Sequence, residues 1–351
     1  MLAPVTHILP LAAIRRNRML PVKGRVLMRA GQKVNPSDVI AEATLTPEHV
    51  VLDVARGLGV STNKAAGFIQ RKVGEEVTKD SIVASRSGLV DRTVRSSNNG
   101  RIVAISGGQV LIEVRNQPFQ LKAGLPGELV SVEADFGGVV QATGAWIQGV
   151  WGNGLINYGI LNVFAEEPGH VLTAGEFNVN QRSTVILAGH CNQRKALEAA
   201  AEVSIRGLIL ASMAPQLVSL AAKMKFPIIV IEGFGPLEMN SAAHTLISTN
   251  ETREVTINAE VLDRYEDKRP EIIIPLEGSG DPPTPLNMET FRQGQRVRVL
   301  RAPHISAIGT IQTLLPGLTP LPSGLRAPSA EIELEGEEKA VVPLANIEVL
   351  G

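Results

Sequence analysis

Apolar runs that are typical of buried strands alternate with amphipathic segments through the middle of this chain, and this alternation constrains the fold more than any other feature. The runs span 183–190, 205–212 and 226–233, and helical periodicity fills the stretches between them. Strands separated by helices of about a dozen residues are typical of a parallel sheet with right-handed crossovers. The sequence therefore predicts an α/β unit, to which the run at 253–261 would add an edge strand.

The carboxyl ends of these strands indicate where a ligand would bind, because open parallel sheets take ligands beyond that edge. The candidate ligand crevice consists of Gly189, His190, Cys191, Ser212, Met213, Glu232, Gly233 and Gly235. Helix N-termini follow the first two strands and could bind an anion. The sequence nevertheless has neither a GxGxxG motif after a strand nor a P-loop. A nucleotide-binding domain of the usual kind is therefore not expected.

Cys191 is the single cysteine of the chain, and its neighbour His190 makes this the one cluster of reactive side chains. A thiol nucleophile with a histidine base is one interpretation, for which the fold could bring Glu232 near the histidine. The other interpretation, which we favour, is a small buried cysteine beside a histidine in a turn, because free cysteine is usually part of a core. The sequence shows no catalytic set, and we expect neither a metal site nor a cofactor.

The length and composition of the chain predict several domains. A chain of 351 residues is too long for one ordinary core. Its 33 glycines and 22 prolines, with only 3% aromatic residues, favour many short strands and turns. We therefore expect a multidomain α/β and β protein. Its parts would be a β domain at 1–135 with a helical insertion at about 47–72, an α/β domain at 136–276, a proline-rich linker at 277–285, and a small barrel at 286–351.

An imperfect repeat marks the first third of the chain. "AGQKVNPSDVIAEA" (30–43) and "VGEEVTKDSIVASR" (73–86) share a glycine followed by apolar residues at matching positions. In each half the glycine would turn the chain and the next valine would start a short inward-facing strand. Residues 20–115 resemble the biotinyl/lipoyl-type barrel-sandwich hybrid, which also occurs in the β′ subunit of bacterial RNA polymerase. The resemblance implies a flattened barrel built from two related halves.

The segment "VLDVARGLGVSTNKAAGFIQRKVG" (51–74), between the two halves, has two further interpretations. Its spacing resembles a helix-turn-helix, and Lys64 resembles the lysine of a lipoyl hairpin. Gly57 and Gly67 weaken both helices, and the carboxylate-rich flank of a lipoyl hairpin is absent. We therefore prefer a helical insertion that caps the barrel.

The last part of the chain alternates apolar and polar residues around a proline and a glycine in "GQRVRVLRAPHISAIGTIQTLL" (294–315). Alternation makes one face of a strand, Pro303 breaks it, and Gly309 would turn the chain tightly before the next strand. The pattern of Gly294, Val297, Val299, Pro303, Gly309 and Ile311 resembles a KOW module, the SH3-like barrel of NusG-type elongation factors. The loop at 316–329 is a possible contact surface.

Positive charge is concentrated at the start of the chain. Residues 1–115 hold 17 Lys and Arg against 9 Asp and Glu, whereas residues 116–285 hold 11 against 19. The two regions could face each other, or the basic one could bind anions. The candidate nucleic-acid contacts are Arg15, Arg16, Arg18, Arg292, Arg296, Arg298 and Arg301. Against nucleic acid, the C-terminal module has an acidic second hairpin and only Phe291 for stacking.

Both tryptophans, Trp146 and Trp151, lie in a glycine-rich stretch and form a candidate interface. Exposed, they would mark a binding face. Buried, they would form the seam between the β-rich front and the α/β unit, and we favour the seam because large aromatic residues are usually mostly buried.

These patterns together favour a non-enzymatic modular binding or scaffold protein that contacts a protein partner or further copies of itself. A nucleic-acid-associated factor in transcription or translation, and a small-ligand or enzymatic α/β domain, are the alternatives. No apolar segment reaches the roughly 18 residues of a membrane span. The basic residues of the N-terminus follow its apolar stretch, which is the reverse of a secretory signal. We therefore expect a cytoplasmic protein without a membrane partner.

Overall fold

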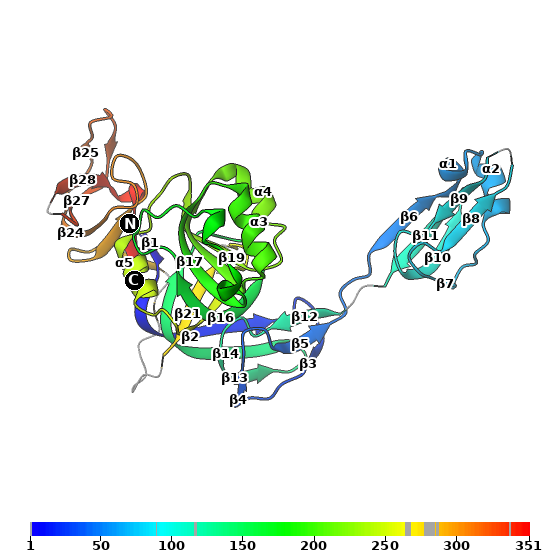
Figure 1. Ribbon diagram of the computed structural model, residues 1–351, viewed down its shortest axis with the longest axis horizontal. Helices are drawn as coiled ribbons and strands as arrows, with labels where there is room; N and C mark the ends of the chain where they lie inside the picture. The colour runs from blue at the N-terminus through cyan, green and yellow to red at the C-terminus, as the bar shows by residue number, and fades with distance from the viewer. Residues whose placement is uncertain are drawn as a thin grey trace.

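A computed structural model defines the fold of the chain. It describes residues 2–88, 90–115, 118–263, 268–276, 285, 288–336 and 338–351. Strands hold 47% of the chain and helices 14%, so the protein is strongly β-rich, and its sheets curl into half-barrels. Figure 1 shows a large central body, a β-rich lobe beside both chain termini, and a small module that projects far to the other side.

One sheet of eleven strands runs through the central body. Its order is β15-β19-β18-β17-β16-β20-β21-β14-β13-β4, with β2 on the other edge of β14. The strands are β2 (Ile8–Met19), β4 (Gln32–Val34), β13 (Gly127–Glu133), β14 (Gly137–Gln148), β15 (Trp151–Gly152), β16 (Ile156–Val163), β17 (Thr184–Cys191), β18 (Gly207–Met213), β19 (Ile228–Phe234), β20 (Glu254–Asn258) and β21 (Glu271–Pro275).

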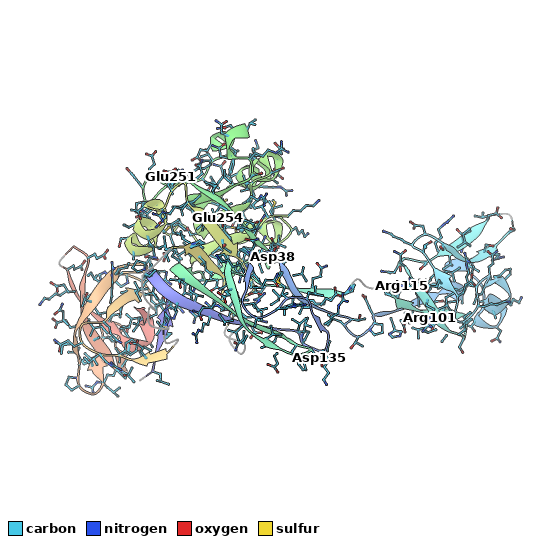
Figure 2. All side chains as sticks on the ribbon, turned by 90° about the horizontal axis from the view of Figure 1, so that it is seen from below. Asp38, Arg101, Arg115, Asp135, Glu251 and Glu254 are labelled. Carbon is cyan, nitrogen blue, oxygen red and sulfur yellow. The ribbon has the colours of Figure 1, made fainter. Side chains whose placement is uncertain are left out.

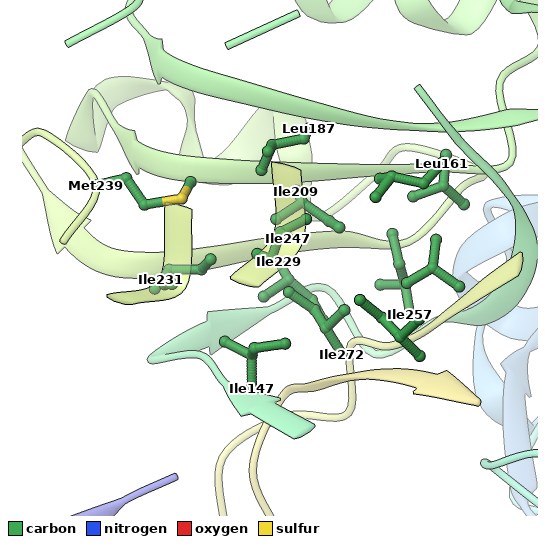
Figure 3. Close-up of a cluster of buried hydrophobic side chains, with 14 of the residues drawn as sticks. Ile147, Leu161, Leu187, Ile209, Ile229, Ile231, Met239, Ile247, Ile257 and Ile272 are labelled. Carbon is green, nitrogen blue, oxygen red and sulfur yellow. The ribbon is translucent and has the colours of Figure 1, made fainter. Parts of the chain in front are cut away.

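The alternating middle of the chain forms a parallel sheet, as the sequence predicts. β16, β17, β18 and β19 pair in parallel. On one face lie α3 (Arg194–Val203) and α4 (Val218–Ala221). Helix α4 has only four residues and is much shorter than the segment with helical periodicity between the apolar runs at 205–212 and 226–233. On the other face, α5 (Ser241–Ser248) and the curled-over β14 and β21 enclose the largely isoleucine core of Figure 3. Helices therefore cover both faces.

Two expectations for this region differ from the structure. β20 does not lie at an edge, because it pairs with β16 on one side and β21 on the other. The expected domain boundary at residue 135 falls in the turn between β13 and β14. These two strands pair with each other in the same sheet, so the sheet continues across the boundary. The β-rich front and the α/β part therefore share one sheet.

The projecting module consists of residues 48–115 and has a core of its own. Its sheet has the order β6-β11-β10-β7, and a hairpin of β8 and β9 packs beside it. The elements are β6 (His49–Asp53), α1 (Val54–Leu58), α2 (Thr62–Ala65), η1 (Ala66–Phe68), β7 (Glu76–Val77), β8 (Ile82–Arg86), β9 (Arg92–Arg95), β10 (Gly100–Ser106) and β11 (Gln109–Val114).

The two halves of the repeat therefore do not share one barrel. The first half supplies β4 and β5 (Val39–Ala43) to the central body, where β5 pairs with β3 (Arg25–Val26) and β12 (Phe119–Lys122). The second half supplies β7 and β8 to the module. Each half buries its strands against different partners, and the short helices belong to the core of the module.

The C-terminal lobe is a sheet in the order β22-β1-β29-β23-β24-β27-β28. Its strands are β1 (Leu2–Thr6), β22 (Met288–Thr290), β23 (Arg296–Val299), β24 (Ile308–Leu314), β27 (Ser329–Leu334), β28 (Lys339–Pro343) and β29 (Ile347–Leu350), and the loop at 316–329 holds β25 (Thr319–Pro320) and β26 (Arg326–Ala327). The first strand of the chain thus lies in the last sheet, parallel to β29. Ala3 and Val5 belong to the core of the lobe.

Gly309 lies inside β24, not at a tight turn as the sequence interpretation holds. A Cβ atom on it would meet the Glu333 carbonyl oxygen and the Ile332 Cγ2 atom, each at 2.6 Å. Close packing between β24 and β27 therefore accounts for this glycine. The expected linker at 277–285 lies outside the described residues except for Pro285.

Candidate functional site

The carboxyl ends of β17, β18 and β19 meet at one edge of the sheet, as the sequence predicts. There His190 Nδ1 lies 2.8 Å from Ser212 Oγ, and this hydroxyl donates to the Leu237 carbonyl oxygen at 2.6 Å. Ser212 is completely buried. The histidine and the serine are therefore brought together by the fold, although the sequence separates them by 22 residues.

This edge is covered by the chain itself. The backbone N–H of His190 donates to the His170 carbonyl oxygen at 2.7 Å, and the N–H of Gly235 donates to the Met213 carbonyl oxygen at 3.0 Å. A Cβ atom on Gly189 would lie 1.8 Å from the His170 carbonyl oxygen. Gly233 and Gly235 both have positive φ in the turn that crosses the strand ends. The segment around His170 and the turn at residues 233–235, the two covering segments, therefore occupy part of the expected crevice.

The two reactive side chains here are poorly suited to nucleophilic catalysis. Cys191 is completely buried, and burial raises the pKa of its thiol to about 11. Its sulfur contacts the Gln193 carbonyl oxygen at 3.9 Å. Burial also lowers the pKa of His190, against a smaller opposing effect of its bond to Ser212. A protonated, enclosed thiol is what a core cysteine shows.

Glu232 binds an arginine of the C-terminal lobe and not the histidine. Its carboxylate receives Arg298 Nη1 at 2.8 Å and the Asn240 backbone N–H at 3.0 Å. Arg298 also donates from Nε to Glu348 at 2.6 Å, and Thr6 donates to that same carboxylate at 2.8 Å. Burial alone would lower the pKa of Arg298, but the two carboxylates raise it. This buried network joins the lobe to the central body.

Several of the candidate nucleic-acid arginines are likewise used inside the fold. Arg298 and Arg18 are 3% and 6% exposed. Arg18 donates to both oxygens of Glu260 at 2.9 Å, and Arg16 donates from Nε to Glu271 at 3.1 Å. Residues from the basic start of the chain thus pair with carboxylates of its acidic middle. These three arginines therefore do not form an exposed basic surface that could follow the backbone of a nucleic acid.

The other four arginines are exposed. Arg296 pairs with Glu335 at 2.6 Å, and Arg15 donates to the Gln141 amide oxygen at 2.8 Å. Within the described part of the chain, neither Arg292 nor Arg301 forms an ion pair. The seven arginines therefore do not form a single free basic surface.

Trp146 lies in the interior and Trp151 at its margin. Trp146 is 3% exposed, stacks on His7 with ring centroids 4.2 Å apart, and donates to Glu271 at 2.9 Å. Trp151 is half-buried and packs edge-on against Phe234. For Trp146 the position matches the seam interpretation, because it lies on β14 between the front and the α/β part.

The outer face of the projecting module is a candidate site that none of the sequence patterns indicates. Three rows of side chains cross β6, β11 and β10 on the side away from the core. The rows are His49–Glu113–Arg101, Val51–Leu111–Ala104 and Asp53–Gln109–Ser106. Figure 2 places Arg101 and Arg115 at the end of the module nearer the central body. The segment "HVVLD" at 49–53 has three consecutive apolar residues, so its sequence alone does not show which side chains face outward.

The middle row of this face is apolar. Val51 is 55% exposed, its cross-strand neighbour Leu111 is half-buried, and Ala104 is exposed. The flanking rows are polar, and Glu113 lies 3.8 Å from Arg101 and 4.0 Å from His49. An apolar centre inside a polar rim is the usual arrangement of a protein–protein interface. β6 is also an edge strand without proline or lysine to block further pairing.

Comparisons with known proteins do not indicate a function for this chain. No protein-family model matches the chain, and a search of curated proteins finds no relative. Within the described ranges, no three histidine, cysteine, aspartate or glutamate side chains are grouped so that they could hold a metal ion. None of the helices among the described residues combines the length and the apolar composition needed to cross a bilayer.

Proposed function

We propose that the protein is a non-enzymatic modular binding protein, and that the outer face of its projecting module contacts another protein. The observation that carries the proposal is the exposed apolar row of Val51, Leu111 and Ala104 between two polar rows. Apolar groups at the centre of such a face contribute most of the binding energy, and the rim excludes water and aligns the partner.

The position of the module supports this function. It stands away from the central body in Figure 1, has its own core around Leu58, Ile102 and Ile112, and therefore presents its outer face without steric interference from the body. The open edge of β6 adds a second means of contact, because an extended segment of a partner can continue the sheet there.

The central body and the C-terminal lobe serve as the base in this proposal. The Arg298 network holds them together. The five strands β23, β24, β27, β28 and β29, with the η5 turn (Leu344–Asn346) before the last, support the KOW-like interpretation of the lobe. The barrel-sandwich interpretation of residues 20–115 forms no part of this proposal, because its two halves pair with different sheets.

Site-specific photocrosslinking tests the contact. A photoreactive amino acid is placed at Val51 and, as a control, at Val73, which is 60% exposed elsewhere on the same module. In the source cells we expect a discrete crosslinked product from position 51 and none from position 73. Sedimentation of the purified protein over a range of concentrations then distinguishes a second copy from a different partner.

A substitution provides the matching loss of function. Val51→Glu places a charge in the apolar row and should abolish the crosslinked product or the self-association, whereas Val73→Glu should not. Because both valines are exposed, each change should alter stability by only about 0.5 kcal/mol. Equal products from both positions, or a product that survives Val51→Glu, would contradict the proposal.

A further inference from the structure

A polar cleft in the central body, separate from the module face, has the lining of a small-molecule site. Its volume is about 770 Å³, and it lies between the end of β2, strand β12, the turn from β15 to β16 and the segment before β19. This is the amino-terminal side of the parallel strands, opposite the edge that the covering segments partly occupy. Small-molecule sites commonly have volumes of roughly 300–1,000 Å³.

Positive charge dominates the described lining of this cleft. Four cationic residues, Arg18, Lys122, Lys225 and Lys268, face it with one carboxylate, Glu260. The carboxylate is already occupied, since it receives Arg18 Nη1 at 2.9 Å and the Asn258 amide at 3.1 Å. It therefore neutralises Arg18 and leaves the charges of Lys122 and Lys225 in excess.

Arg18 is held in a fixed position at the wall. Its side chain is 7% exposed, and its Nε donates to the Lys122 carbonyl oxygen at 3.0 Å. Its Nη1 binds Glu260, and among the described residues its Nη2 makes no hydrogen bond. A guanidinium fixed in this way keeps one donor for a ligand, and little conformational entropy is lost when it binds.

Lys122 and Lys225 form no ion pair within the described part of the chain. Lys122 is half-buried, which makes its unpaired charge more costly than that of a fully exposed lysine. Two unpaired lysines at one cleft repel each other, and a bound anion would remove this repulsion. The arrangement therefore favours a ligand with more than one negative charge.

The same cleft has an apolar wall. Phe119 is 40% exposed and Leu155 is 36% exposed, and both line it. An exposed aromatic ring beside unpaired cations suits a ligand that has an anionic part and a flat apolar part. We infer that the cleft binds an organic phosphate, with its phosphate groups at Lys122, Lys225 and Arg18 and its ring against Phe119.

Isothermal titration of the purified full chain tests this inference, with ADP, inorganic pyrophosphate and adenosine as probes. We expect saturable binding of ADP, weaker binding of pyrophosphate and no measurable binding of adenosine. Lys122→Gln with Lys225→Gln should raise the Kd for ADP at least about tenfold. Lys223→Gln is the matched control, because Lys223 is exposed close to Lys225 but does not line the cleft.

A second variant separates the two parts of the ligand. Phe119→Ala should weaken ADP binding and leave pyrophosphate binding unchanged. The inference is wrong if neither ADP nor pyrophosphate binds saturably, or if the double lysine variant binds ADP as tightly as the Lys223→Gln control. These titrations need no protein partner, so their outcome is independent of the photocrosslinking result.

Discussion

Arg298 of the C-terminal lobe and Glu232 at the end of β19 form an ion pair of 2.8 Å, and their side chains are 4% and 1% exposed. Water cannot screen this pair, and Glu348 supplies the second carboxylate that the guanidinium needs. A buried ion pair stabilises a fold little more than well-packed apolar residues in its place would. Removal of only one partner is strongly destabilising, because it leaves the other charge buried and unpaired.

Arg298→Ala should therefore destabilise the protein by about 3–5 kcal/mol, because it leaves two carboxylates buried without their cation. Urea denaturation measures the change in the free energy of unfolding. The control is Arg296→Ala two residues away, whose pair with Glu335 is about half exposed and should contribute about 0–1 kcal/mol. Equal effects of the two substitutions would show that the buried network does not hold the lobe.

Cys191 should be unreactive in the folded protein. A thiol whose pKa is about 11 is almost entirely protonated at neutral pH, and this one is also fully buried. Labelling with a disulfide reagent should be slow in buffer and fast in urea, and should accelerate as the pH rises toward 11. Because the chain has a single cysteine, each label reports this site. Rapid labelling of the native protein at neutral pH would restore the nucleophile interpretation.

His190 should make the protein less stable in mild acid. Burial lowers its pKa in the folded state, so the unfolded chain binds the proton more readily as the pH falls below about 6.5. Its contribution is therefore fully present above that pH and is lost as the pH decreases toward the folded pKa. Glu232, near the end of the neighbouring strand β19, pairs with Arg298 and not with the histidine.

The measurement is the free energy of unfolding between pH 7 and pH 5 for the wild type and for His190→Asn, whose amide can still bond Ser212. The difference between the two curves isolates the histidine from the carboxylates that titrate at lower pH. A difference that stays constant across this interval would mean that His190 has an ordinary pKa.

Gly309→Ala should destabilise the C-terminal lobe by about 1–3 kcal/mol through overpacking. The added Cβ atom would meet a backbone oxygen and a methyl group at 2.6 Å. Gly175→Ala is the control, since nothing lies within 4 Å of its added atom and its φ is not positive. Thermal unfolding followed by circular dichroism compares the two, and unchanged melting of the Gly309 variant would indicate that β24 and β27 can separate at no cost.

The parts of the fold that sequence predicts well are those set by neighbouring residues. The parallel strands around Ile186, Leu208 and Ile228 could be predicted, because each buried apolar run and its following helix are local in sequence. Neighbouring parallel strands end at the same edge of the sheet, so the sequence also predicts that the ends of β17 and β18 lie side by side. The contact between His190 and Ser212 follows from this arrangement.

The remaining features depend on partners far away in the chain. Nothing near Arg16 or Arg18 in sequence indicates that Glu271 and Glu260 will pair with them. The repeat at 30–43 and 73–86 predicts two similar local turns, and both glycines do have positive φ, but the repeat cannot show that the halves join different bodies. The polar cleft likewise gathers residues that lie far apart in the sequence, from Asn17 to Lys268.

The pairing of β1 with β29 has a consequence for synthesis. Residues 2–6 leave the ribosome long before the strand at residues 347–350, with which they pair, has been made. Val5, which is 2% exposed in the finished protein, must therefore remain in water or in contact with a chaperone until residues 347–350 emerge. The lobe closes only after residues 347–350 have been made, so a product that terminates before them would leave β1 without this pairing and would be open to degradation.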